Sequence, residues 1–153
     1  MITYLEAGNL FACGCQALVN AVNTRGVMGA GLALQFRSRW PRMFVEYKRV
    51  CAREQLQPGG LHSVKVNPDG TYPEWIFNVA TKDHWKNPSR LEWVEQGIAE
   101  IRRVVVSIGI ASVGIPALGC GLGGLQFSSI RPIIDKELGS LTDVDIRIFQ
   151  PRV

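Results

Sequence analysis

Two glycine-rich segments, residues 23–31 and 116–125, are the parts of this sequence best suited to bind an anion. Each follows a hydrophobic run that predicts a strand and precedes a pattern that predicts a helix. Backbone amides at a helix N-terminus hold phosphate oxygens, and glycine lets a ligand approach the main chain. Neither segment is a Walker A motif or a GxGxxG fingerprint, so each alone could also be a tight connection. Together, at strand ends, they predict a cleft for a diphosphate.

The segment 82–90 places a histidine, an indole and three cations on one predicted loop. Single-stranded nucleic acid is commonly held by aromatic stacking and phosphate neutralisation. On that interpretation Trp85 stacks on a base and Lys86 or Arg90 contacts a phosphate, while His84 could instead carry a proton. On the other interpretation Trp85 packs into the following helix and the cations form a solvated surface. The sequence leaves both open.

Alternating strands and helices are expected to position these segments. Hydrophobic patterns predict strands at residues 2–5, 17–22, 61–66, 75–80, 112–115 and 146–149. They predict helices at 29–39, 41–50 and 128–138, and a fourth from Ser89 to residue 102 or 103, with Ser89 and Glu92 as a capping box. The alternation predicts an α/β domain with a mixed or largely parallel sheet.

The composition describes one domain, residues 1–153. The chain is 46% hydrophobic and 20% charged, which is typical of a globular domain that folds without disulfides. Its formal net charge of +4 is compatible with an anionic ligand but does not establish nucleic-acid binding. The four cysteines lack paired CxxC spacing, so we expect reduced thiols and no structural zinc. The start of the chain has no leader pattern, and the uncharged stretch 104–130 is rich in glycine, so we expect a cytoplasmic protein without a membrane partner.

Five segments together resemble the macrodomain family, whose members are ADP-ribose-binding α/β/α modules. The resemblance is strongest to the branch that contains the DNA ADP-ribosyl glycohydrolase antitoxin DarG and the terminal ADP-ribose glycohydrolase of animals. The segments are residues 6–10, 17–23, 26–36, 81–85 and 116–127. The resemblance implies a three-layer α/β/α fold around a mixed, largely parallel central sheet.

The resemblance also implies a set of residues that bind the whole of ADP-ribose. Asn9, where the family usually has Asp, and Leu10 would face the adenine, and Phe149 would stack on it or pack in the core. Asn23 would hold the distal ribose, while residues 27–29 and 119–122 would hold the diphosphate. The complete expected set is Asn9, Leu10, Asn20, Asn23, Val27, Met28, Gly29, Gly119, Cys120, Gly121, Leu122 and Phe149.

Lys82 is the catalytic residue that the resemblance implies, because it lies in a Thr-Lys pair directly after a predicted strand. A neutral lysine is a nucleophile toward an anomeric carbon or an opened aldehyde, and a protonated one supports a departing group. Both roles stay open, as does that of a solvated loop lysine. The usual glycosidase pair of carboxylates is not predicted, since Asp83 is the one acid near these loops.

The activity that the resemblance implies is the removal of ADP-ribose from modified DNA, without a metal or cofactor. Gly123 and Gly124 stand where the animal enzyme has an acidic residue, which favours DNA over a protein substrate. Expected partners are ADP-ribose, single-stranded ADP-ribosylated DNA contacted by His84, Trp85, Lys86 and Arg90, and a cognate ADP-ribosyltransferase toxin. Two alternatives remain: a non-catalytic ADP-ribose reader, and a hydrolase of ADP-ribosyl esters on acidic side chains of proteins.

Overall fold

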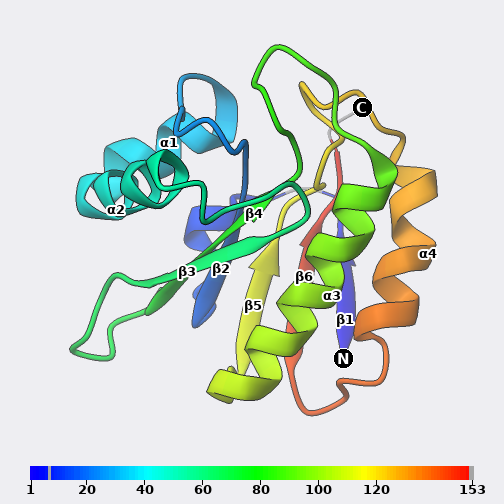
Figure 1. Ribbon diagram of the computed structural model, residues 1–153. Coiled ribbons are helices and arrows are strands. Elements are labelled where there is room, and N and C mark those ends of the chain that lie inside the picture. Colours follow the sequence, from blue (N-terminus) through cyan, green and yellow to red (C-terminus); the bar gives the residue numbers. More distant parts are fainter. Residues whose placement is uncertain (7, 152–153) are drawn as a thin grey trace.

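The computed structural model describes residues 1–6 and 8–151, so Ala7 of the resembling segment 6–10 lies outside the described residues. Its strands form one six-stranded sheet in the order β1-β6-β5-β2-β4-β3 (Figure 1). They are β1 (Ile2–Leu5), β2 (Ala17–Val22), β3 (Leu61–Lys65), β4 (Trp75–Ala80), β5 (Ser112–Ile115) and β6 (Asp145–Phe149). Only β3 runs antiparallel to its neighbour, so the mixed, largely parallel sheet is confirmed.

Helices cover both faces of this sheet. On one side lie the short 3-10 helix η1 (Leu10–Ala12), α1 (Gly31–Arg39) and α2 (Pro41–Ala52), and on the other α3 (Leu91–Ile108) and α4 (Phe127–Leu138) (Figure 1). Strand β2 shows why both layers form. Leu18 and Val22 pack with the α1–α2 layer, whereas Ala17 and Val19 pack with the α3–α4 layer. The three-layer α/β/α fold predicted from the sequence is therefore confirmed.

The start of α3 differs from the predicted capping box. The N-cap is Arg90 rather than Ser89, and it makes no side-chain capping bond. Ser89 instead donates its backbone amide to the Gly123 carbonyl at 3.0 Å. Because this long-range contact fixes Ser89 outside the helix, the local Ser-x-x-Glu pattern did not decide the helix boundary.

The end of α3 also differs, because the helix continues past residue 103 to Ile108. Val104 and Val105 extend its buried face, and Gly109 ends the helix in a left-handed conformation with φ of +83°. The other predicted helices and strands agree with the structure to within about two residues at each end, as expected for frayed termini.

The parallel strands determine where the functional segments emerge. Strands β1, β2, β4, β5 and β6 all point the same way, so the loops that follow them meet at one edge of the sheet. Both glycine-rich segments and the segment 81–90 start at that edge. None of the helices in the described part of the chain is long and apolar enough to cross a membrane.

Candidate active site

A cavity of about 520 Å³ opens at the sheet edge where β2, β4 and β5 end. This volume lies within the usual range for a small-molecule site. The lining residues come from the ends of these strands and from the segments that follow them. They are Ala21, Val22, Asn23, Val27, Gly29, Ala30, Gly31, Leu32, Ala33, Thr81, Lys82, Trp85, Ser89, Pro116, Ala117, Gly119, Gly121, Leu122 and Gly123.

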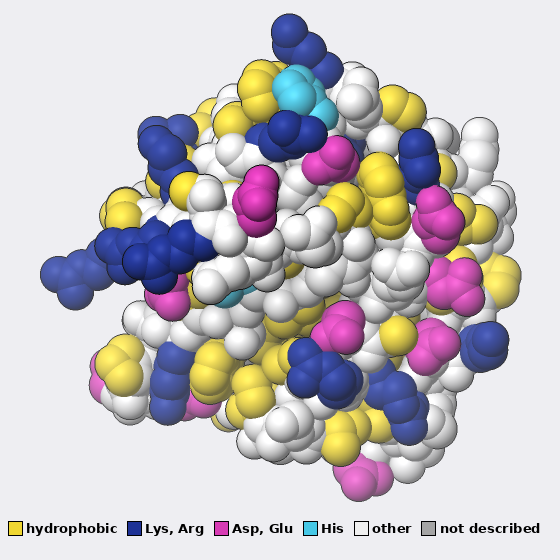
Figure 2. Space-filling model, viewed as in Figure 1, with side chains coloured by type: hydrophobic (Ala, Val, Ile, Leu, Met, Phe, Trp, Pro, Cys, Tyr) yellow, Lys and Arg dark blue, Asp and Glu magenta, His cyan; other side chains and the backbone are white. Residues whose placement is uncertain are grey.

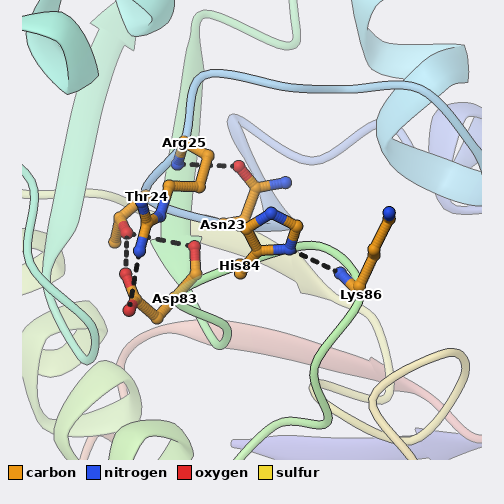
Figure 3. Close-up of polar contacts among 6 residues, drawn as sticks. All are labelled: Asn23, Thr24, Arg25, Asp83, His84 and Lys86. Carbon is orange, nitrogen blue, oxygen red and sulfur yellow. Dashed lines mark hydrogen bonds and ion pairs between the residues drawn. The ribbon is translucent and has the colours of Figure 1, made fainter.

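The first glycine-rich segment is shaped by Asn23. Its Nδ2 donates to the Val27 carbonyl at 2.8 Å. Its Oδ1 accepts from the Arg25 amide at 2.9 Å, as Figure 3 shows. These bonds fold the chain back before it enters α1, and Val27, Gly29 and Gly31 then line the cavity. Asn23 itself is 8% exposed, so it both supports the turn and borders the cavity.

Tyr47 of α2 is hydrogen-bonded to Asn23. Its hydroxyl lies 2.6 Å from the Asn23 backbone oxygen and 3.0 Å from Oδ1, so its single proton is shared between two acceptors. The side chain is fully buried, and this burial raises the pKa of the Tyr47 hydroxyl above its usual range. The sequence analysis predicted a helix over residues 41–50, which contains Tyr47, but nothing in the sequence indicates that this residue contacts the site.

We expect Tyr47→Phe to destabilise the protein by about 1–3 kcal/mol, because the backbone oxygen of the buried Asn23 loses the Tyr47 donor, although Oδ1 keeps its bond from the Arg25 amide. Urea unfolding of both proteins measures this difference. A change below about 0.5 kcal/mol, the range of a neutral surface substitution, would contradict the role given to Tyr47.

The second glycine-rich segment, residues 116–125, is packed so tightly that two of its glycines cannot carry a side chain without displacing their neighbours. A Cβ on Gly123 would lie 2.5 Å from the Gly119 carbonyl oxygen and would also collide with Ser89 Oγ. Gly119 has φ of +74°, and its carbonyl accepts from the Leu125 amide at 2.9 Å. The segment is therefore a defined turn whose shape sets one wall of the cavity.

Lys82 connects this wall to the segment that follows β4. Its Nζ donates to the carbonyl oxygens of Trp85 and Leu122, each at 3.2 Å. Two such bonds leave the nitrogen with a third N–H when it is protonated, or with a lone pair when it is neutral. Lys82 is the only ionisable side chain among the cavity-lining residues, so any acid–base or charge effect from within the cavity falls to it.

Asp83, the carboxylate next to Lys82, lies against the first glycine-rich segment. Its Oδ1 accepts from Thr24 Oγ1, its Oδ2 pairs with Arg25 at 3.2 Å, and its carbonyl accepts from the Thr24 amide at 3.1 Å (Figure 3). The Thr24 hydroxyl, followed by the Arg25 guanidinium, holds the pKa of Asp83 below its usual range. Asp83 therefore ties two cavity segments together as an ionised group.

His84 and Trp85 form a stacked pair at the rim of the cavity. Their ring centroids are 3.9 Å apart and the planes differ by 23°. Trp85 is 45% exposed and lines the cavity, while His84 Nδ1 accepts from the Lys86 amide at 3.1 Å (Figure 3). The pair presents a fixed aromatic surface next to the cavity mouth.

The two cations of the predicted nucleic-acid loop are placed differently. Lys86 is exposed on the same turn as His84. Arg90 lies at the start of α3, 3.6 Å from a Glu92 oxygen and stacked 4.9 Å from the centre of the Trp93 ring. The structure therefore groups Lys86 with the rim pair but engages Arg90 with neighbours on α3.

Several residues of the expected binding set lie outside the cavity lining. Asn20 and Met28 are completely buried, and Asn20 Nδ2 donates to Asn78 Oδ1 at 3.1 Å across β2 and β4. Their side chains belong to the interior of the sheet and the α1–α2 layer, with no surface left for a ligand. Cys120 is half-buried, and burial raises the pKa of its thiol to about 11, which keeps it protonated.

The residues expected at the adenine lie beside the cavity, where β1 and β6 end. Asn9 is the N-cap of η1 and accepts from the Phe11 amide at 2.9 Å, while Leu10 is buried below it. Phe149 ends β6, and a Cβ on Gly8 would lie 3.1 Å from its ring. Strand β6 is next to β5, so Asn9 and Phe149 lie near the second glycine-rich segment, which follows β5, and are not part of the cavity lining.

Ser89 is the lining residue whose place the sequence analysis assigned incorrectly. It is 6% exposed, and its Oγ has no hydrogen-bond partner among the described residues. This oxygen is buried, and a Cβ on Gly123 would collide with it, so the side chain packs against the second glycine-rich segment. The position of Ser89 directly before a helix with Glu92 at the capping spacing concealed this contact.

The arrangement can hold an extended anionic ligand with one amine at its side. Residues of two glycine-rich segments line a cavity whose lining includes no carboxylate, and Lys82 connects the second of these segments to the aromatic rim. Among the described residues, no group of three His, Cys, Asp or Glu side chains could hold a metal ion.

Comparison with known proteins gives consistent matches. Residues 19–134 match the family described as Macro domain. The chain is similar to the DNA ADP-ribosyl glycohydrolase of Mycobacterium tuberculosis, with 41% identity over 99% of this chain and 42% of that protein. It is also similar to a DNA ADP-ribosyl transferase-DNA ADP-ribosyl glycohydrolase fusion protein of Thermosipho africanus, with 33% identity over 96% of this chain and 41% of that protein.

Solved structures match equally well. The macrodomain of Mycobacterium tuberculosis DarG has a TM-score of 0.94 at 40% identity and covers 99% of this chain and 98% of its own. Thermosipho africanus DarTG in complex with ADP-ribose has a TM-score of 0.88 at 33% identity and covers 98% of this chain and 41% of its own. The chain spans about two fifths of the length of these two curated relatives.

Proposed function

The chain belongs to the macrodomain family, and we propose that it is an ADP-ribosyl glycohydrolase that removes ADP-ribose from modified DNA bases. The observation that carries this proposal is the position of Lys82, which lines the cavity and whose amine contacts both the second glycine-rich segment and the backbone of Trp85 at the aromatic rim. The relatives named for this activity support it.

The two glycine-rich segments would hold the diphosphate. The segment from Val27 to Gly31 leads into α1, whose N-terminal amides and dipole favour an anion. Residues 119–123 would contact the diphosphate from the other side, and Asn23 would border the distal ribose. Asn9 and Phe149, at the ends of β1 and β6, would meet the adenine. Held in this way, the bond to be cleaved has a fixed position, which supplies much of the rate.

The proposed reaction breaks the bond between C1″ of the distal ribose and the modified base. The hydroxyl of water ends on C1″ and its proton on the base. As a nucleophile, neutral Lys82 would attack C1″ and form a C–N bond as the bond to the base breaks, and the proton lost from Nζ would go to the departing base. Water would then hydrolyse this adduct, whose ring-opened form is a Schiff base, and restore the amine. As a cation, Lys82 would stabilise the charge that develops as the base departs. The first route uses the lone pair of neutral Nζ, and the second uses the third N–H of the protonated amine; neither is engaged by the two carbonyl contacts.

A DNA substrate is favoured by the rim of the cavity. The stacked pair of His84 and Trp85 offers an aromatic face to a base that emerges from the mouth, and Lys86 is exposed beside it. The turn of residues 119–123 carries no carboxylate. We further propose that residues 1–153 act as a single macrodomain in the cytoplasm. A DNA ADP-ribosyl transferase would be its partner, in line with the Thermosipho africanus fusion protein.

Parallel assays on two substrates test the proposal. The protein is offered a single-stranded oligonucleotide ADP-ribosylated on a base and a protein ADP-ribosylated on glutamate, and released ADP-ribose is measured by chromatography. We expect release from the oligonucleotide. Release from the protein alone would reject DNA as the substrate. Binding of ADP-ribose in calorimetry with no release from either would make the chain a reader rather than an enzyme.

A further inference from the structure

The helices α1 and α2 carry the whole formal charge excess of the protein. Residues 31–54 hold six cations and two carboxylates, which gives +4, and the remaining eleven cations and eleven carboxylates cancel. All six cations are exposed. We call this surface the basic face; it consists of Arg37, Arg39, Arg42, Lys48, Arg49 and Arg53.

These cations are not neutralised within the protein. Arginines elsewhere pair with carboxylates, as Arg25 does with Asp83 and Arg103 with Glu100. In contrast, no cation of the basic face lies within 4.0 Å of a carboxylate oxygen anywhere in residues 1–6 and 8–151. Glu46 of α2 lies 4.0 Å from His62 Nε2, and burial lowers the pKa of His62, which favours the neutral imidazole over an ion pair. The positive potential of this surface is therefore free to act on a partner.

Three of the six cations form a row along one side of α2, whereas Lys48 and the Phe44 ring under Arg37 lie on another side of that helix. Arg42 and Arg49 of α2 and Arg53 at its C-cap are seven and four residues apart, so they share one side of the helix over about 16 Å. Two more are oriented by aromatic rings, because Arg37 stacks 4.3 Å from the centre of the Phe44 ring and Arg39 4.2 Å from that of Phe11. Figure 2 shows the resulting concentration of Lys and Arg side chains on the α1–α2 side of the molecule.

The basic face adjoins the cavity. Helix α1 begins with Gly31, Leu32 and Ala33, which line the cavity, and ends at Arg39 next to the start of α2. Helix α1 therefore connects the cavity lining to Arg37 and Arg39 of the basic face. The other layer offers no equivalent, since α3 and α4 together carry five carboxylates and four cations.

We propose that the basic face binds the phosphates of the DNA strand that flanks the modified base. The inference rests on the proposed function for the identity of its partner. Polyanion binding needs cations without internal counterions, and single-stranded DNA supplies one phosphate per nucleotide along a path that starts at the cavity. The binding does not depend on base sequence, because the cations contact the backbone only.

The salt dependence of binding to an unmodified, fluorescently labelled single-stranded oligonucleotide tests the proposal. In single-stranded DNA each neutralised phosphate contributes about 0.7 to the slope of log K against log salt. We expect the triple variant Arg42→Gln/Arg49→Gln/Arg53→Gln to lower that slope by about 2 and to weaken binding at low salt. The substitutions are exposed, and glutamine is a good helix former, so Tm should not change.

A matched variant removes the same charge from the opposite layer. Arg103→Gln/Arg131→Gln/Lys136→Gln lies on α3 and α4 and should keep the parent slope. The proposal is wrong if the α2 variant keeps the parent slope, if both variants lose it equally, or if the α2 variant loses binding only to vesicles of anionic phospholipid. Calorimetry with free ADP-ribose separates this result from the proposed function, because the α2 variant should bind ADP-ribose as the parent does.

Discussion

Lys82→Ala is expected to lower the rate of ADP-ribose release from modified DNA by about 10²- to 10⁴-fold, the range of a single positioned acid, base or nucleophile. Lys82 is the only ionisable side chain among the lining residues, so no neighbouring group in the cavity can replace it. Calorimetry should show that the variant still binds ADP-ribose within about tenfold of the parent affinity, since the main-chain amides remain. A variant that releases ADP-ribose as fast as the parent would remove Lys82 from the mechanism.

Lys82→Arg distinguishes the two roles of this residue. Its guanidinium keeps the charge and can still donate to the carbonyls of Trp85 and Leu122, but it stays protonated and cannot attack carbon. Substantial release by this variant would assign Lys82 to charge stabilisation, whereas loss equal to that of Lys82→Ala would assign it to nucleophilic attack. Borohydride trapping of the parent with substrate supplies an independent readout, because only the nucleophile forms a reducible adduct.

Gly123→Ala is expected to weaken ADP-ribose binding by one to two orders of magnitude, or about 1.4–2.8 kcal/mol. The added Cβ would lie 2.5 Å from the Gly119 carbonyl oxygen, and backbone cannot yield there as a flexible side chain would. The turn must therefore open, which moves the amides of residues 119–122 from the cavity wall. Calorimetry measures the affinity, and the same strain should lower Tm by several degrees.

Gly121→Ala is the matched control for stability. It adds the same methyl group two residues away, at a position where a Cβ has nothing within 4 Å. Its Tm should stay at the parent value, which shows that the turn tolerates a side chain where space exists. If Gly123→Ala has parent-like affinity and Tm, the shape of this turn does not set the wall of the binding site.

Local sequence patterns were sufficient to predict most of the strands and helices of the fold. Strand β2 illustrates why: its residues alternate between the two helix layers but are nearly all buried, which produces a continuous apolar run. The helix boundaries that were wrong are those set by distant residues. Ser89 satisfies a capping pattern locally, yet its amide is bonded to Gly123, 34 positions further along the chain.

Local sequence patterns also made part of the candidate site predictable. Glycine-rich segments that follow strands indicate a ligand-binding site at one edge of the sheet, because the carboxyl ends of parallel strands meet at the same edge. Asn20 was not distinguishable from Asn23 in the same polar and apolar run, although the structure buries the first against Asn78 and leaves the second beside the cavity. Tyr47 was not recognised because it approaches Asn23 from another helix.

The sequence by itself determined the α/β layering, the two glycine-rich segments at strand ends and the presence of a lysine directly after β4. These features depend only on the hydrophobic periodicity and on the order of residue types along the chain. Only the tertiary structure decided that Lys82 reaches Leu122 and that Ser89 lines the cavity. It also decided that, among the residues that the structure describes, no carboxylate oxygen lies within 4.0 Å of a cation of α1 or α2. The physical reason is that hydrogen bonds and charge pairing depend on distance in space, and residues tens of positions apart are brought together only by packing of the helices on the sheet.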